Sequence, residues 1–383
     1  MIVLFDYQVF EEQKIGGISR YFYELYKHFD IDQDISIQLP INYSENIYLK
    51  SINKYKDLPP ELIHPYQKFI PGLKFRGKRK LYSFFSRKVY SESNLERAIS
   101  TLKTNEYDIF HPTYYNPYFL DIIKMKPLVI TVHDMTTEMY PEYFPEYDRT
   151  SDRKKLITKR ADKIIAVSES TKNDLINLLG ISTEKIEVIY HGSSLNITSD
   201  SNNIELKLPR SYLLYVGKRT LYKNFTFFIE SIKNVLVKNP ELKIICTGQP
   251  FSDSEKQYFR LNNIENNLIH YFIDDILLSK LYSSAIAFVF PSLYEGFGIP
   301  VLEAFSCGCP CILSNTSSLP EVGGDAAIYF DPRSSESIQS AVTNVLQSNE
   351  VQNDLRLKGY EQLKKFSWSN SAAKTKEIYK KLI

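Results

Sequence analysis

This 383-residue chain lacks several features that would assign it at once to a large class of proteins. No apolar run approaches the ~20 residues of a membrane-spanning helix, so the sequence predicts no such helix. No GxGxxG motif follows a strand-like segment, which disfavours a dinucleotide-dependent oxidoreductase, and the absence of GxxxxGK[ST] excludes a P-loop kinase. Three of the four cysteines alternate at positions 307, 309 and 311, without the C-x2-C pairs of zinc sites. We interpret them as buried thiols.

The charges nearly cancel, because the formal net charge is +2 with 24% charged and 43% hydrophobic residues. This composition is typical of a globular protein and argues against binding of polyanions through overall charge. The length suits two domains of about 150 to 200 residues each. The first 13 residues carry acidic groups where a signal peptide needs a basic region, so a cytoplasmic location is the default expectation.

The most informative segment covers residues 285–310, AIAFVFPSLYEGFGIPVLEAFSCGCP. An apolar run of strand length leads into a glycine-spaced loop, residues 295–298, and Pro300 then opens a predicted helix. A strand, a glycine-rich turn and a helix start together direct backbone N–H groups and a positive dipole end at an anion. Glu295 and Glu303 flank this site, where carboxylates suit hydrogen bonds from neutral hydroxyls such as those of a sugar.

The same segment resembles a known enzyme family. Glu295 and Glu303, inside PSLYEGFGIPVLEA, resemble the E-x7-E motif of the large retaining glycosyltransferase family numbered four. Residues 317–332, SSLPEVGGDAAIYFDP, are similar to the segment that follows it in that family. The resemblance implies an α/β protein of the GT-B type, with two Rossmann-like doubly wound parallel-sheet domains that face each other across a cleft.

The rest of the chain fits this architecture. Apolar strands alternate with helical segments, which predicts parallel sheets covered on both faces and ligands beyond the carboxyl ends of the strands. The polar residues 193–209 read as an interdomain linker. We therefore expect an N-terminal acceptor domain over residues 1–194 and a nucleotide-sugar domain over 195–367. The final helix, 368–383, resembles the family's closing segment, which packs back onto the first domain.

In the first domain, Gly16 and Gly17 lie between a strand and a helix. The pair permits close backbone approach to a ligand, although a plain tight turn is the alternative. The resemblance implies that this turn faces the donor diphosphate. Strand ends supply His111 and His133, and the resemblance implies a contact of His133 with the donor sugar. The candidate acceptor residues are Arg20, His111 and Tyr114, of which His111 and the aromatic loop after it could instead simply pack.

In the second domain, Arg219 and Lys223 lie at another strand-to-helix turn, where basic residues can neutralise a diphosphate. They match the family's diphosphate-binding pair; an ordinary charged loop is the alternative. The resemblance also places the turn at Ile273 near the nucleobase. The two acids after it, Asp274 and Asp275, are interpreted as helix caps rather than metal ligands.

The resemblance implies transfer of a sugar from a nucleotide diphosphate to an acceptor hydroxyl with retained configuration, without a cofactor or metal. Arg219, Lys223 and the glycine turn would stabilise the leaving diphosphate. Glu295 and His133 would hold the sugar. The remaining donor contacts expected are the ribose contact of Glu303 and the backbone at Phe297, Gly298 and Ile299.

The donor and acceptor stay open. Mannose from GDP-mannose is favoured by the look of residues 317–332, and the expected acceptor is a lipid-linked or growing surface saccharide of the O-antigen or capsule kind. A nucleotide-sugar 2-epimerase of the same two-domain form is an alternative from another class, and a non-catalytic partner-binding subunit is a third.

A basic, aromatic stretch covers residues 74–88, KFRGKRKLYSFFSRK, within a region free of acidic residues between Glu61 and Glu92. It is a solvated surface segment, a patch that binds anionic lipid headgroups, or a nucleic-acid patch. Lipid binding would make the protein peripheral on the inner face of the membrane. Nothing else supports a nucleic-acid partner. The basic residues are Lys74, Arg76, Lys78, Arg79, Lys80, Arg87 and Lys88.

Overall fold

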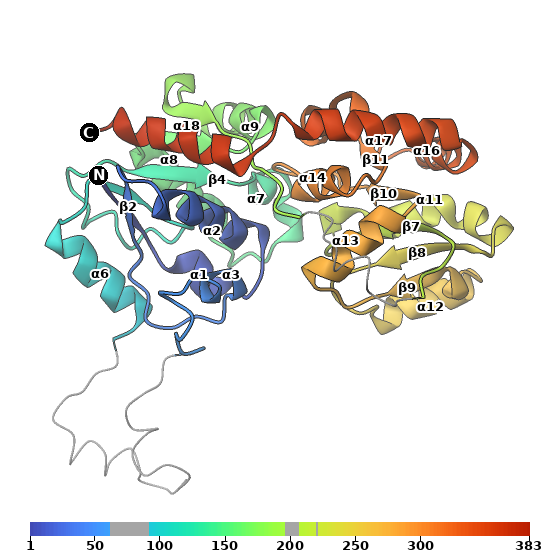
Figure 1. Ribbon diagram of the computed structural model, residues 1–383, viewed down its shortest axis with the longest axis horizontal. Coiled ribbons are helices and arrows are strands. Elements are labelled where there is room, and N and C mark those ends of the chain that lie inside the picture. The colour runs from blue at the N-terminus through green and yellow to red at the C-terminus, as the bar shows by residue number, and fades with distance from the viewer. Residues whose placement is uncertain (62–91, 196–206, 220) are drawn as a thin grey trace, which may run out of the picture. The chain divides into compact units, whose positions relative to one another are not determined.

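The computed structural model describes residues 1–61, 92–195, 207–219 and 221–383 (Figure 1). By packing, the chain divides into two compact units, each described by itself below. The first comprises Met1–Thr131, Arg149–Ile165 and Ala372–Ile383; the second comprises Val132–Asp148 and Ala166–Ser371. Most of the predicted linker, and the whole basic stretch 74–88, lie outside the described residues.

The first unit contains a parallel three-stranded sheet in the order β2-β1-β3. Its strands are β1 (Ile2–Phe5), β2 (Ser36–Gln38) and β3 (Ile109–His111). Its helices are α1 (Gln8–Glu12), α2 (Gly17–Asp30), α3 (Ile47–Lys50), α6 (Asn94–Thr104), α8 (Thr150–Arg160) and most of α18 (Trp368–Lys380). The apolar stripe of α2 is buried, as its helical spacing predicts.

The closing helix α18 is held within the first unit by buried and charged contacts. Lys376 pairs with Asp32 at 2.6 Å and with Asp34 at 3.0 Å. The fully buried Tyr379 bonds through its hydroxyl to His111 Nδ1 at 2.6 Å. A turn of the first unit and the end of β3 are thus both joined to the last residues of the chain.

A second three-stranded sheet has the order β4-β5-β6, with β4 (Val129–Val132), β5 (Lys163–Ala166) and β6 (Ile186–Val188). Helix α7 (Thr136–Met139) and the short η1 (Pro141–Tyr143) follow β4, and α9 (Glu169–Leu179) and η2 (Thr183–Lys185) separate β5 from β6. By packing, α9 belongs to the second unit, although its sequence position falls within residues 1–194.

The second unit contains a parallel six-stranded sheet in the order β12-β11-β10-β7-β8-β9 (Figure 1). The strands are β7 (Ser211–Tyr215), β8 (Leu242–Cys246), β9 (Leu268–His270), β10 (Ala287–Phe290), β11 (Cys311–Ser314) and β12 (Ala327–Phe330). The chain runs outward from β7 to β9 and then returns to place β10 on the other side of β7. The order therefore reverses between β7 and β10, and ligands of such sheets bind at this switch point.

Helices cover both faces of this sheet, which confirms the predicted doubly wound α/β class. They are α11 (Phe225–Lys238), α12 (Asp253–Leu261), α13 (Asp275–Ser284), α14 (Ile299–Ser306), α15 (Leu319–Gly323), α16 (Ser335–Gln347) and α17 (Asn349–Leu363), with short turns η3 (Leu221–Lys223), η4 (Glu265–Asn267) and η5 (Gly324–Ala326). Residues that alternate along β7 and β10 enter opposite cores: Leu214 and Phe288 pack with α13 and α14, and Leu213 and Val289 with α11 and α16.

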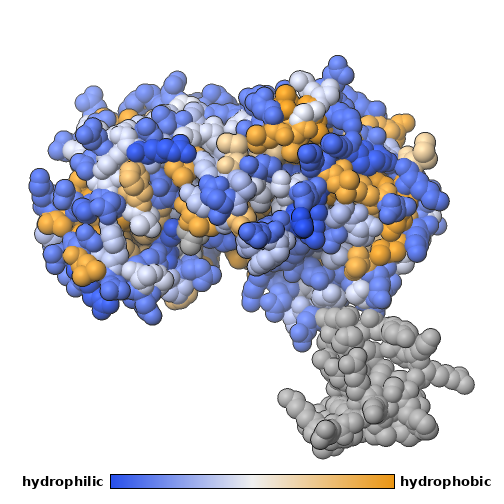
Figure 2. Space-filling model, turned by 180° about the vertical axis from the view of Figure 1, so that it is seen from behind, coloured by the Kyte–Doolittle hydropathy of each residue, from blue (hydrophilic) through white to orange (hydrophobic). Residues whose placement is uncertain are grey.

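All four cysteines are buried and unpaired within these two cores, which confirms their interpretation as buried thiols. On the face shown in Figure 2, hydrophobic residues lie in separate patches among hydrophilic ones. Within the described parts of the chain, the helices all fall short of the length and apolarity that crossing a membrane requires.

Candidate active site

Two loops meet at the switch point of the six-stranded sheet. The loop after β7 carries Lys223 and the loop after β10 carries Glu295, and the Lys223 Nζ lies 2.6 Å from the Glu295 Oε1. The two side chains are 19% and 12% exposed, so the ion pair is largely buried. The structure thus brings together two residues that the sequence analysis had assigned to sugar and diphosphate binding from segments 72 positions apart.

The surroundings of Lys223 favour its charged form. Burial, the largest single effect, would lower the pKa of the Lys223 ammonium. The charge and hydrogen bond of Glu295, together with smaller effects of Tyr222 and Asp134, outweigh it, and the pKa lies above its ordinary value. The ammonium also lies 5.0 Å from the ring centroid of Tyr222 and 5.7 Å from that of Phe290. Aromatic faces attract a cation at these distances. A permanent positive charge is therefore positioned at the carboxyl ends of β7 and β10.

The loop after β7 has an uncommon backbone. Leu221 and Asn224, on either side of Lys223, both have φ of 58°. Asparagine tolerates this left-handed conformation, whereas a leucine seldom adopts it. Asn224 also donates from Nδ2 to the Pro332 carbonyl at 2.8 Å, which ties the loop to the segment after β12. Backbone strain of this kind tends to be concentrated at functional sites.

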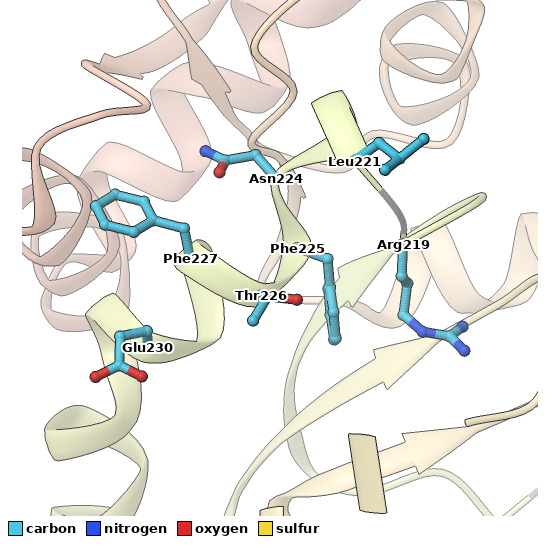
Figure 3. Close-up of a pocket in the computed structure, with 7 residues that line it drawn as sticks. All are labelled: Arg219, Leu221, Asn224, Phe225, Thr226, Phe227 and Glu230. Atoms are coloured by element: carbon cyan, nitrogen blue, oxygen red, sulfur yellow. The ribbon is translucent and has the colours of Figure 1, made fainter. Parts of the chain in front are cut away.

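A hollow of about 320 Å³ lies beside this loop, at the start of α11 (Figure 3). The first backbone N–H groups of a helix lack partners within the helix, so polar ligand atoms can approach there. The lining residues are Arg219, Leu221, Asn224, Phe225, Thr226, Phe227 and Glu230.

Arg219 is directed away from the Lys223–Glu295 pair. Its Nε lies 2.8 Å from Glu255 Oε1, and its terminal nitrogens donate to the carbonyls of Gln249 and Pro250 at 2.7 and 2.8 Å. The guanidinium also stacks 4.7 Å from the ring centroid of Phe251. In Figure 3 the side chains of Arg219 and Leu221 leave the loop in different directions. These bonds hold the guanidinium against the segment after β8. The predicted contact of Arg219 with the diphosphate would therefore require them to break.

Two positions in the loop after β10 require glycine because of the space and the backbone conformation there. A Cβ at Gly296 would lie 1.8 Å from the carbonyl oxygen of His133, so the two chain segments can be this close only with glycine. Gly298 has φ of 107° and caps the start of α14, a conformation that glycine adopts at low cost. Helix α14 begins at Ile299, one residue before the predicted Pro300.

The family-like segment at residues 317–332 holds this loop in place. The Glu295 N–H donates to the Ser317 hydroxyl at 2.9 Å, and the Ser318 hydroxyl contacts the carbonyls of Glu295 and Phe297 at 2.9 and 2.8 Å. Glu303, on α14, is buried, and its carboxylate accepts from the Tyr282 hydroxyl at 3.3 Å. Hydroxyl groups thus hold the backbone of Glu295 and the carboxylate of Glu303.

His133 lies next to a histidine that the sequence analysis missed. The rings of His133 and His191 stack with centroids 5.9 Å apart and planes at 28°, and His191 in turn packs against Phe297 at 4.8 Å and Trp368 at 5.4 Å. Burial, with a smaller effect of His133, holds the pKa of His191 well below its ordinary value. The sequence signal that could have identified His191 is the His-Gly pair just after a strand. Glycine is needed at position 192 because a Cβ there would lie 2.4 Å from the Trp368 backbone nitrogen.

The turn at Ile273, which the resemblance predicts to lie near the nucleobase, contains a helix cap. Asp274 Oδ1 accepts from the Leu277 N–H at 2.8 Å at the start of α13, which confirms its interpretation as a cap. Ile273, just before it, is half-buried and packs on the core beneath α13.

Within the first unit, the glycine turn and the acceptor candidates lie in different environments. Gly16 is the residue before α2, which begins at Gly17, and α1 lies between β1 and this turn. The buried Arg20 guanidinium lies 5.3 Å from the ring centroid of Tyr48. Tyr114 is half-buried against the Tyr115 ring.

His111 is fully buried, and its two ring nitrogens lie 2.6 Å from the Tyr379 hydroxyl and 3.0 Å from the Thr131 hydroxyl. These are contacts of a core residue. An acceptor contact through His111 would need this arrangement to open.

Comparison with known proteins decides the family. Residues 58–196 match the family model described as "Glycosyltransferase Family 4", and residues 196–362 match "Glycosyl transferases group 1". The chain belongs to glycosyltransferase family 4. This confirms the resemblance on which the sequence analysis relied.

Two curated relatives of this family 4 glycosyltransferase are named as O-antigen chain mannosyltransferases. O-antigen chain mannosyltransferase B of Escherichia coli is 29% identical over 289 residues, which are 72% of this chain and 74% of the relative. O-antigen chain mannosyltransferase RfbU of Salmonella typhimurium is 32% identical over 221 residues, or 57% of this chain and 60% of the relative.

Solved structures confirm the GT-B fold of the family 4 glycosyltransferase. Sucrose-phosphate synthase from Thermosynechococcus elongatus has a TM-score of 0.72 at 18% identity and covers 100% of this chain and 98% of its own. HepE of Anabaena, solved in complex with UDP and glucose, has a TM-score of 0.69 at 16% identity and covers 98% of both chains.

Proposed function

We propose that this glycosyltransferase moves a sugar, with mannose from GDP-mannose favoured, onto a lipid-linked or growing saccharide of an O-antigen-like or capsule-like polysaccharide. The transfer retains the anomeric configuration and proceeds without a metal ion. The observation that carries the proposal is the buried Lys223–Glu295 pair at the switch point between β7 and β10. Such a pair supplies one positive and one negative partner within a few ångströms. This suits a sugar phosphate, whose phosphate needs a positive partner and whose hydroxyls can donate to a negative one.

In the proposed complex the two partners separate to serve different parts of the donor. Glu295 accepts a hydrogen bond from a sugar hydroxyl, and the Lys223 ammonium moves to the phosphate oxygens as a point charge. The backbone at the start of α14, with its positive dipole end, adds a second stabilising group. Once the donor is bound, both groups are in place before the chemical step, so they stabilise the charge that develops on the leaving diphosphate.

The chemical step needs no covalent enzyme intermediate. The bond between the anomeric carbon and the leaving phosphate oxygen breaks, and the acceptor hydroxyl oxygen forms the new bond on the same face. The proton of that hydroxyl passes to the leaving phosphate. Glu295 acts by holding the sugar, His133 is a second sugar contact, and Glu303 binds the ribose.

The relatives support the choice of donor and acceptor. Two proteins at 29% and 32% identity carry names of O-antigen mannosyltransferases, in agreement with the mannose donor favoured from residues 317–332. The basic stretch 74–88 would bring the enzyme to the membrane that carries a lipid-linked acceptor, and this stays a prediction from sequence.

Nucleotide release tests the function. The purified protein is incubated in EDTA with GDP-, UDP- and dTDP-sugars, with and without a crude lipid-linked saccharide fraction. We expect release of GDP from GDP-mannose that the fraction stimulates. Consumption of donor without any acceptor would favour the 2-epimerase, and silence with every donor, together with no thermal stabilisation by nucleotides, would favour the partner-binding subunit.

A further inference from the structure

One helix of the second unit, α9, holds the loop that carries Glu295. Ser168, at its N-cap, and Thr171 and Asp174 follow one another at intervals of three residues, so they share one face of the helix. All three contact residues of the loop after β10. Thr171 and Ser168 are fully buried, and these contacts are therefore shielded from water.

Two of the contacts converge on a single backbone oxygen. The Ser168 hydroxyl donates to the Gly296 carbonyl at 2.6 Å, and the Thr171 hydroxyl donates to the same oxygen at 3.1 Å. Ser168 also accepts the Thr171 N–H at 2.9 Å, which caps the helix. A carbonyl held by two hydroxyls from one rigid helix is fixed in direction as well as in distance.

The third contact lies on the other side of Glu295. The Tyr294 hydroxyl donates to Asp174 Oδ2 at 2.6 Å and accepts the Met135 N–H at 3.2 Å. Tyr294 is buried, with 3% of its surface exposed. The residues immediately before and after Glu295 are therefore both bonded to α9.

Helix α9 is itself anchored to the segment that supports the loop from the opposite side. The Glu321 carboxylate, on α15, accepts the N–H groups of Glu169 at 2.8 Å and of Ser170 at 3.3 Å. Three residues earlier, Ser318 contacts the Glu295 carbonyl. Hydrogen bonds thus join the loop to α9, α9 to α15, and the residue before α15 to the Glu295 backbone.

We propose that Ser168, Thr171 and Asp174 are positioning residues that set the place of the Glu295 carboxylate relative to Lys223, and with it the affinity for the donor sugar. The inference rests on the proposed role of Glu295 as a sugar ligand. In this proposal the three act through the loop after β10 and not by contact with the donor. Directional hydrogen bonds on both neighbours of Glu295 restrict the carboxylate more closely than apolar packing would, and small displacements of binding groups cost much activity.

The test compares Thr171→Val, which removes the hydroxyl at constant shape, with Thr171→Ser, which keeps it. Thr158→Val is the matched control, because Thr158 is also a buried helical threonine whose hydroxyl bonds a backbone carbonyl, that of Lys154 at 2.8 Å. Donor KM, acceptor KM, turnover and melting temperature are measured for each variant.

We expect Thr171→Val to raise the donor KM about fivefold to tenfold, as the loss of one buried hydrogen bond predicts, with the acceptor KM unchanged. Thr171→Ser should restore the donor KM, and Thr158→Val should leave it unchanged. An unchanged donor KM in Thr171→Val would overturn the proposal. A second result would also overturn it. In that result Thr171→Val lowers the melting temperature far more than Thr158→Val does, and Thr171→Ser restores neither the melting temperature nor the donor KM.

Hydrogen exchange of the peptide covering residues 292–298 separates this inference from the proposed function, because it needs no donor. Faster exchange in Thr171→Val than in Thr171→Ser would support the positioning role even if the wild-type protein transferred no sugar. Equal exchange in the two variants would refute it even if the transferase activity were established.

Discussion

The Lys223–Glu295 pair offers the most decisive prediction. Lys223→Met removes the ammonium and leaves the Glu295 carboxylate, whose side chain is 12% exposed, without its 2.6 Å partner. Removal of one member of a buried ion pair costs about 3 to 5 kcal/mol of stability, because the other charge stays desolvated. Since both groups retain some contact with solvent, we expect about 3 kcal/mol.

A double-mutant cycle measures the coupling. Lys223→Met, Glu295→Gln and the double variant are unfolded in urea, and the double variant should lose clearly less stability than the sum of the single variants. Lys233→Met is the matched control. Its Nζ lies at the same 2.6 Å from Glu230, but the two side chains are 35% and 46% exposed, so that variant should lose little stability.

The same variants test catalysis. Lys223→Met and Glu295→Gln should each lower donor turnover about 100-fold, the usual cost of one preorganised transition-state group. Lys233→Met should transfer sugar at the wild-type rate. If the single variants were additive in stability and retained full turnover, the pair would be neither coupled nor catalytic, and the assignment of this site would be wrong.

Three further predictions concern the same chain. Gly296→Ala should lower donor turnover at least tenfold in a folded protein, because the added Cβ would lie 1.8 Å from the His133 carbonyl and must displace the loop; wild-type turnover would contradict the geometry. Since burial holds the pKa of His191 well below its ordinary value, the unfolded chain binds the proton more tightly, and stability should fall as the pH drops below about 6.5, by up to about 1.4 kcal/mol per pH unit. Urea midpoints at pH 5.5 and 7.5 should show this slope, and His191→Phe should reduce it. Tyr379→Phe should cost about 1 to 3 kcal/mol in urea titrations, because it removes the hydroxyl bonded to the buried His111, and an unchanged stability would show that this bond is not needed.

The sequence by itself determined the class of fold and the centre of the candidate site. Apolar strands that alternate with helices predict parallel sheets, because strands buried on both faces need apolar side chains throughout. The loop around Glu295 was recognisable because its glycines and the following proline meet local backbone requirements, which act within a few residues. Motifs of this local kind also identified Lys223.

Only the tertiary structure decided which predicted residues come together. Arg219 and Lys223 are four positions apart, yet Arg219 bonds to Glu255 and Lys223 to Glu295. The difference depends on which distant loop packs beside each side chain, and no local pattern encodes that. The burial of His111 likewise depends on Tyr379, 268 positions away.

The hydrogen bonds from Thr171 and Ser168 to the Gly296 carbonyl join residues that are 125 and 128 positions apart. A serine N-cap and a threonine three residues later read in the sequence as ordinary helix chemistry. Their second bonds exist because the fold places that helix start against the loop after β10. Local rules of the backbone therefore determined the elements and the motifs, and long-range packing determined their partners.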